Sequence, residues 1–317
     1  MSLPSIRSLS TSTSPPTSTS PFTPTIHPIF ESSTGTWQYI VACPSTHRAA
    51  IIDPVLDYDR ATQTVSPTTA LALLEQVSRA GYTVEMILES HVHADHLTAA
   101  FFLQNRLARA QGGLRPPIGI GKRVEQVQRQ FGRRYSIGDD EYVGVFDRLF
   151  DDNEIFAIGD LRGEVMHLPG HTPDHLGYKF GDDVFCGDSL FHPDIGTARC
   201  DFPGGSSEAL FRSGRRLLAL PGHVRIWTGH DYPPADGARP AVPWTSVAEH
   251  RAQNKHLMDG ISQQDFVALR SARDASMAAP KLLHPSLQIN IRAGRMPSPT
   301  DKGDRLLHLP MKGGDLV

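Results

Sequence analysis

VEMILESHVHADH, residues 84–96, joins a short apolar run to three histidines and an aspartate. The run at residues 84–88 is typical of a buried strand. In an extended or turning loop His91 and His93 point the same way, and Asp95 and His96 follow on the neighbouring turn. Imidazole suits zinc, iron or manganese, and an added carboxylate favours a harder or more oxidising centre. The segment therefore predicts a metal site at the end of a strand.

Three later segments repeat this design, in which a short apolar strand runs into a turn with a metal-ligand side chain. They supply His171 in PGHT (169–172), Asp188 in GDS (187–189) and His230 in TGHDY (228–232). Strand ends are rigidly positioned and face the clefts where α/β folds usually bind ligands. We therefore expect the seven side chains to form one metal-binding cluster. His175 and Asp53 are expected to have structural roles or to hydrogen-bond a ligand.

Strand-like and helical segments alternate along the chain. Strands are predicted at residues 36–41, 49–52, 84–88, 164–168, 184–186 and 225–228. Helices are predicted at residues 68–80, 97–110, 122–131, 207–220 and 246–258. This alternation indicates an α/β layered domain over roughly residues 26–235.

The composition excludes several classes of protein. With 31 Lys and Arg against 34 Asp and Glu, the net charge of −3 gives no basic excess for binding nucleic acid. No apolar run approaches the roughly 20 residues of a membrane helix. Three cysteines do not make a disulfide scaffold, which favours a reducing compartment.

The chain ends differ in composition from the centre. Residues 1–25 are almost all Ser, Thr and Pro, which predicts a disordered leader, and residues 301–317 are expected to form a flexible tail. The leader lacks the apolar core of a secretory signal. A single catalytic domain with a C-terminal extension is expected at residues 26–300, in the cytoplasm or the mitochondrial matrix.

The seven metal-ligand residues resemble the metal-site motifs of the metallo-β-lactamase superfamily, in the same order and with plausible gaps. The resemblance covers about residues 26–232 and implies a four-layer αββα sandwich. Membership alone does not fix the reaction, because this fold hosts hydrolases, oxidoreductases and nucleases.

Within the superfamily the sequence looks most like persulfide dioxygenases, and next like glyoxalase II. The segment GTARCDFPGG (196–205) matches the dioxygenase pattern at Arg199, Asp201 and Phe202, while Ala198 and Cys200 depart from it. The segment NIRAG (290–294) is also similar to that branch. The resemblance implies oxidation of glutathione persulfide by dioxygen to sulfite and glutathione.

Two interpretations of the metal site remain open. The dioxygenase resemblance implies one Fe(II) held by His91, His171 and Asp188, with His93, Asp95, His96 and His230 around it. The glyoxalase II resemblance implies two zinc ions, or zinc and iron, for thioester hydrolysis. In that case His91, His93 and His171 bind one metal, Asp95, His96 and His230 bind the other, and Asp188 bridges them. A catalytically dead scaffold would usually have lost a ligand, and none is missing.

The resemblance also implies substrate contacts. Arg199, Asp201 and Tyr232 are the candidate catalytic residues, and Arg199, Tyr232 and Arg292 are the candidate substrate-binding residues. Arg199 suits a substrate carboxylate, and its alternative role is a salt bridge to Asp201. The alternative for Tyr232 is packing at the site rim. The expected partners are a glutathione-derived thiol or persulfide and a second copy of the chain, without nucleic acid or membrane.

Overall fold

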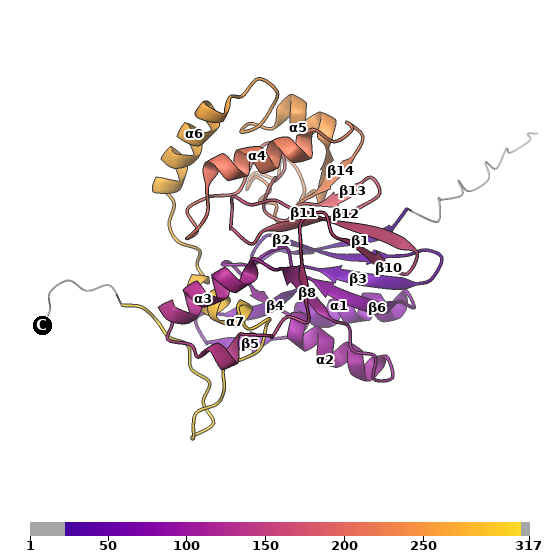
Figure 1. The fold of residues 1–317 in the computed structure, drawn as a ribbon, viewed down its shortest axis with the longest axis vertical. Coiled ribbons are helices and arrows are strands. Elements are labelled where there is room, and N and C mark those ends of the chain that lie inside the picture. The colour runs from indigo at the N-terminus through magenta and orange to yellow at the C-terminus, as the bar shows by residue number, and fades with distance from the viewer. Residues whose placement is uncertain (1–22, 312–317) are drawn as a thin grey trace, which may run out of the picture.

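Two six-stranded sheets face each other, and helices cover both outer surfaces (Figure 1). The computed structural model describes residues 23–311. The first sheet has the order β1 (Thr25–Glu31), β2 (Thr36–Ala42), β3 (Arg48–Ile52), β6 (Thr83–Leu88), β8 (Ile118–Gly121) and β9 (Arg148–Phe150). The second has the order β10 (Ile155–Ile158), β11 (Leu161–His167), β12 (Leu176–Phe180), β13 (Asp183–Phe185), β14 (Arg225–Trp227) and β15 (Trp244–Ser246).

Helices form the two outer layers. In Figure 1, α1 (Thr68–Arg79) and α2 (Ala100–Ala110) lie at the lower side of the sheets and α3 (Val124–Arg134) lies at their left. The helices α4 (Ser207–Leu218), α5 (Val247–Gln253) and α6 (Gln263–Ala275) lie above the sheets. The C-terminal helix α7 (Leu283–Asn290) packs against α3 and against the short strand β7 (Leu97–Thr98). β7 pairs with β4 (Val55–Asp59), which also pairs with β5 (Thr64–Ser66). β7 directly follows the histidine-rich loop and so ties the end of that loop to this small sheet.

Three separate apolar cores lie between the four layers. In β2, Ile40 packs with the first helical layer, whereas Tyr39 and Val41 pack between the two sheets. Successive side chains of a strand point to opposite faces, so a central strand in a four-layer fold must be apolar on both. Leu217 of α4 and Ile226 of β14 belong to the third core, between the second sheet and the upper helices. The predicted αββα sandwich is confirmed.

The predicted helices differ from the observed ones at their ends, and two of the differences have a clear physical cause. The helix expected at residues 97–110 begins at Ala100, because Leu97 and Thr98 instead pair with Leu56 and Val55 of β4. The helix expected at residues 246–258 begins with a Ser246 capping box and ends at Gln253. Asn254 stops it, since its backbone is extended and its side-chain amide donates to the carbonyl of Gly196.

The chain ends lie mostly outside the described residues. Most of the predicted disordered leader, residues 1–22, and the tail residues 312–317 are not described, and β1 already begins at Thr25. Residues 301–311 form no helix or strand. In the described part of the chain, every helix is too short or too polar to cross a membrane.

Gly170 lies against Leu210 of α4, so a substitution at Gly170 tests how tightly the second sheet packs on this helix. Its φ is +145°, and a Cβ there would lie 2.3 Å from the backbone nitrogen of Leu210. We expect Gly170→Ala to lower the free energy of unfolding by about 3 kcal/mol or more, from backbone strain and overpacking together. Urea titration measures the loss.

Gly81→Ala is the matched control. Gly81 also has a positive φ, +68°, but nothing lies within 4 Å of the added Cβ. Only the backbone strain remains, which is about 1 kcal/mol. Equal losses in the two variants would contradict the packing described here.

Candidate metal centre

The ends of four strands bring the predicted ligands together at one edge of the sandwich. The loop after β6 supplies His91, His93, Asp95 and His96, and the turns after β11, β13 and β14 supply the remaining three, His171, Asp188 and His230. β6 lies in the first sheet and the other three strands lie in the second, so the site spans the interface between the sheets. All seven predicted ligands lie in two neighbouring groups.

The first group contains His91, His171 and Asp188. The Asp188 Oδ2 lies 4.0 Å from Nε2 of His91 and 3.6 Å from Nε2 of His171. The other ring nitrogens are held by the protein: Nδ1 of His91 lies 2.9 Å from the Ser90 hydroxyl, and Nδ1 of His171 lies 2.7 Å from the carbonyl of Arg199. Both rings therefore present Nε2 to the aspartate.

The second group contains His93, Asp95, His96 and His230. Nε2 of His230 lies 3.1 Å from the Asp95 carboxylate, and its Nδ1 lies 3.3 Å from the Thr36 hydroxyl. His93 falls in this group and not with His91 and His171.

The donor atoms fit a metal ion. Two ligands on one metal about 2.1 Å away are roughly 3.0–3.4 Å apart. Asp188 Oδ2 lies slightly farther than this, at 3.6–4.0 Å, from the Nε2 atoms of His91, His171 and His230. Buried polar atoms are normally hydrogen-bonded. Within residues 23–311 five buried atoms of the predicted ligands lack a hydrogen-bond partner: His91 Nε2, His93 Nδ1, His96 Nε2, His230 Nε2 and Asp188 Oδ1. A bound cation would satisfy them.

The protonation of the groups also suits a cation. Burial, reinforced by the neighbouring imidazoles, lowers the pKa of His91 well below its usual range and that of His96 to about 3. Removal from water alone would raise the pKa of Asp95, but the nearby His230 and His96 rings outweigh it and hold that pKa at about 2. Free imidazole lone pairs and a carboxylate are the forms that bind metals.

His93 is paired with two carboxylates that lie outside the seven predicted ligands. Its Nε2 lies 3.1 Å from Asp53 Oδ1 and 3.4 Å from Glu89 Oε2. Burial would lower the pKa of His93, but these carboxylates outweigh it and raise that pKa well above its usual range. Asp53 also accepts the Ser90 backbone N–H at 2.6 Å. Asp53 thus supports the ligand loop, which was one of its two expected roles.

Two more residues fix the ligands from outside the two groups. His175 Nε2 accepts the backbone N–H of Asp188 at 2.9 Å, as expected of a residue supporting a ligand. The Asn290 amide donates to the carbonyls of His93 and His96, both at 2.8 Å, and accepts the Thr98 N–H. Asn290 lies in the segment NIRAG, which was noted above only for its similarity to persulfide dioxygenases. No local sequence pattern predicts its contacts, because they span almost 200 residues.

The predicted substrate residues occupy different places. The guanidinium of Arg199 donates to both Asp201 carboxylate oxygens at 2.5 Å, which is the salt bridge expected as its alternative role. The backbone carbonyl of Arg199 contacts His171 and so places this residue at the site. The Tyr232 ring is half exposed and stacks on His230, with 5.8 Å between ring centroids. Arg292 is buried and its guanidinium is held by Glu141, so the structure does not bring it to the ligand cluster.

Two hollows reach the cluster. One, of about 190 Å³, exposes His171 and is lined by Arg134, Arg199, Asp201 and Phe202 among others. The other, of about 590 Å³, is lined mainly by the β4–β5 hairpin and reaches the buried His96 at its base. A small molecule therefore has access to the first group of ligands through a hollow with two arginines.

A family model described as the metallo-beta-lactamase superfamily matches residues 34–230. The chain belongs to this superfamily. The family model thus ends at His230, the last of the seven predicted ligands, and membership confirms the resemblance stated from the motifs.

Known relatives extend the match beyond the family model. The chain is 42% identical over 291 residues to a "Beta-lactamase hydrolase-like protein" of Xylella fastidiosa, covering 91% of this chain but 65% of that protein. It is 40% identical over 299 residues to a "Probable metallo-hydrolase" of Burkholderia pseudomallei, covering 90% of this chain and 99% of that one. Among solved structures, ETHE1 from Myxococcus xanthus has a TM-score of 0.68 and 25% identity, covering 86% of this chain and 100% of that chain.

The support of Asp188 by His175 can be tested by metal binding. In His175→Ala the Asp188 backbone N–H loses its acceptor, and such supporting contacts typically change metal affinity about 10- to 100-fold. We expect a loss of that size, measured by competition with a chelator. His223→Ala is the control, because His223 is exposed and pairs only with Asp182. Unchanged affinity in His175→Ala would contradict the role given to His175.

Proposed function

We propose that this protein is an iron-dependent persulfide dioxygenase. It would convert glutathione persulfide, dioxygen and water to glutathione, sulfite and two protons. The observation that supports this most directly is the grouping of His91, His171 and Asp188 without His93. Two histidines and one carboxylate are the ligand set of non-haem Fe(II) oxygenases and leave positions open for substrate and dioxygen.

Two further observations support the dioxygenase. The segment from Arg199 to Phe202, which distinguishes the persulfide dioxygenase pattern from that of glyoxalase II, lies against the metal group through the contact of His171 with the Arg199 carbonyl. The chain also resembles ETHE1, a persulfide dioxygenase, over the full length of that structure.

The metal would supply one kind of chemistry. Fe(II) held by His91, His171 and Asp188 would bring the persulfide sulfur and dioxygen together and allow electrons to pass between them, a reaction that is otherwise slow. The protein's part is positioning. Ser90 and the Arg199 carbonyl orient the two imidazoles, and His175 fixes the backbone of Asp188.

The substrate would enter through the hollow beside His171. Its arginines, Arg134 and Arg199, match the carboxylates of a glutathione-derived substrate. Arg199 is paired with Asp201 in the present structure, so it would exchange this partner for the substrate carboxylate. Tyr232, stacked on His230, lies at the edge of the cluster, where a phenol can hydrogen-bond the substrate.

A dinuclear thioester hydrolase is the second candidate. The observation that favours it is the complete second group, with Asp188 Oδ2 only 3.7 Å from His230 Nε2 and so between the two groups. Two metals bridged by a carboxylate would activate water for attack on a thioester carbonyl. The name of the Burkholderia relative agrees with a hydrolase.

Oxygen consumption distinguishes the two functions. When glutathione persulfide is added to iron-loaded protein, we expect rapid oxygen uptake with roughly one sulfite formed per dioxygen consumed. An oxygen electrode and a sulfite assay measure both. Hydrolysis of a glutathione thioester by the same preparation, without oxygen uptake from the persulfide, would favour the second candidate.

Ligand variants locate the reaction. His91→Ala should abolish both iron binding and oxygen uptake, because it removes one of three ligands. His96→Ala should retain most of the iron, since His96 belongs to the second group. Equal loss of iron in both variants would count against a site with one metal.

A further inference from the structure

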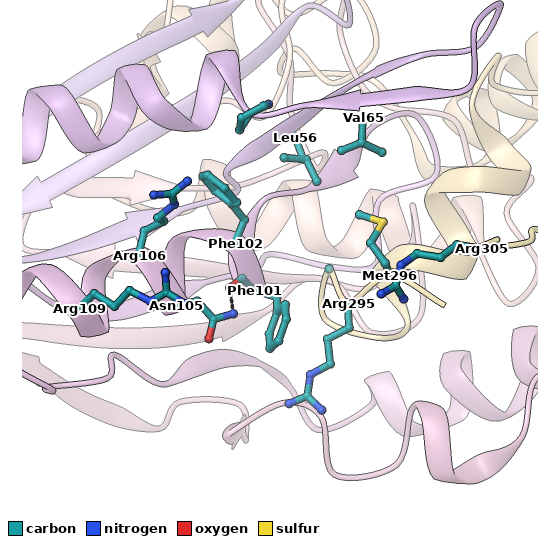
Figure 2. Close-up of a pocket in the computed structure, with 12 residues that line it drawn as sticks. Leu56, Val65, Phe101, Phe102, Asn105, Arg106, Arg109, Arg295, Met296 and Arg305 are labelled. Atoms are coloured by element: carbon teal, nitrogen blue, oxygen red, sulfur yellow. Dashed lines mark hydrogen bonds between the residues drawn. The ribbon is translucent and has the colours of Figure 1, made fainter. Parts of the chain in front are cut away.

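A third cavity, of about 680 Å³, lies on the α2 side of the molecule (Figure 2). Its walls come from the β4–β5 hairpin, from α2, and from the segment that follows α7. None of its lining residues belongs to the two metal-ligand groups. Its volume falls within the range of small-molecule binding sites, about 300–1,000 Å³.

The interior of this cavity is apolar. Phe101 and Phe102 of α2, Leu56 and Val65 of the hairpin, and Met296 line it, and they occupy the middle of the view in Figure 2. Val65 remains 38% exposed, so apolar surface is left for a ligand to cover.

Four arginines surround this apolar surface: Arg106, Arg109, Arg295 and Arg305. No acidic residue lines the cavity. In the part of the chain that the structure describes, none of these four arginines forms an ion pair. Many other arginines of this protein do pair with a carboxylate, among them Arg199 and Arg292. Nε of Arg295 is buried without a hydrogen-bond partner among residues 23–311. Arg295 and Arg305 donate only to backbone carbonyls, those of Val145 and Pro297. Four positive charges without a carboxylate partner in the described chain, placed around an apolar surface, attract an anion.

The arginine positions also indicate the shape of the anion. Arg106 lies over the Phe102 ring at 5.3 Å and Arg295 over the Phe101 ring at 5.1 Å. A face of each ring is therefore already covered by a cation, which leaves less room for stacking of a flat nucleobase. The surface that remains beside Leu56, Val65 and Met296 suits an aliphatic chain.

We propose that this cavity binds a small amphipathic anion, with its aliphatic chain on Leu56, Val65 and Met296 and its carboxylate or phosphate on the arginines. Arginine suits such a head group because its planar fork can donate two hydrogen bonds to either anion. The apolar chain supplies binding energy in proportion to the surface that it buries. The inference does not depend on the reaction at the metal centre.

Calorimetric titration of the full chain tests the proposal, with decanoate and decyl phosphate as probes below their micelle concentrations. We expect one site per chain for at least one of these anions, with about tenfold tighter binding than for 1-decanol, which lacks the charge. Decyltrimethylammonium, which carries the opposite charge, should not bind. Whichever anion binds more tightly identifies the head group.

Two matched variants place the site. Arg106→Glu reverses a charge at the cavity and should weaken binding about tenfold or more. Arg212→Glu makes the same change on the exposed surface of α4, outside the cavity, and should leave binding unchanged. Arg106 is exposed and makes no contact with the metal ligands, so oxygen uptake and metal content should be unaffected.

Several results would overturn the proposal. These are no binding of either anion at millimolar concentration, equal loss of binding in Arg106→Glu and Arg212→Glu, or equal affinity for 1-decanol and the anions. Binding of adenosine triphosphate at this site without binding of the decyl anions would also reject an aliphatic ligand.

Discussion

The carboxylate of Asp188 and the three imidazole nitrogens around it set the main constraint on this structure. Asp188 Oδ2 lies 3.6–4.0 Å from Nε2 of His91, His171 and His230, which is too far for hydrogen bonds. A cation held by His91, His171 and Asp188 explains the first two of these spacings. Leaving such groups buried without partners is costly. The rest of the fold holds the ligands in this arrangement. Four strand ends position them, and hydrogen bonds from His175, Asp53 and Asn290 fix the backbone around them.

The sequence predicted the parts of this arrangement that depend on local pattern. Short strand-like runs identified β2 and β6. The cluster of His91, His93, Asp95 and His96 directly after the second run identified the metal loop. A helix was misplaced at Leu97 for a physical reason. Leu97 and Thr98 satisfy their backbone groups by pairing with β4, and a contact between distant segments overrides the local helical pattern.

Contacts across long separations could not be predicted in this way. Asn290 donates to the carbonyls of His93 and His96 only because α7 packs against β7. Arg292, two residues later, donates instead to Glu141. Both residues belong to the segment NIRAG (290–294) that resembles persulfide dioxygenases. The structure gives that segment a clear role in supporting the ligand loop, while its proposed role in substrate binding still rests on the resemblance.

The division of the seven ligands into two groups is the central feature of the proposed chemistry, and crystallography of the iron-loaded protein tests it most directly. Anomalous diffraction at the iron absorption edge locates each metal ion in the site. The account predicts one iron per chain, bound by His91, His171 and Asp188. Two metal peaks roughly 3.5–4 Å apart, bridged by Asp188 and with His93 as a ligand, would contradict it and favour the dinuclear hydrolase.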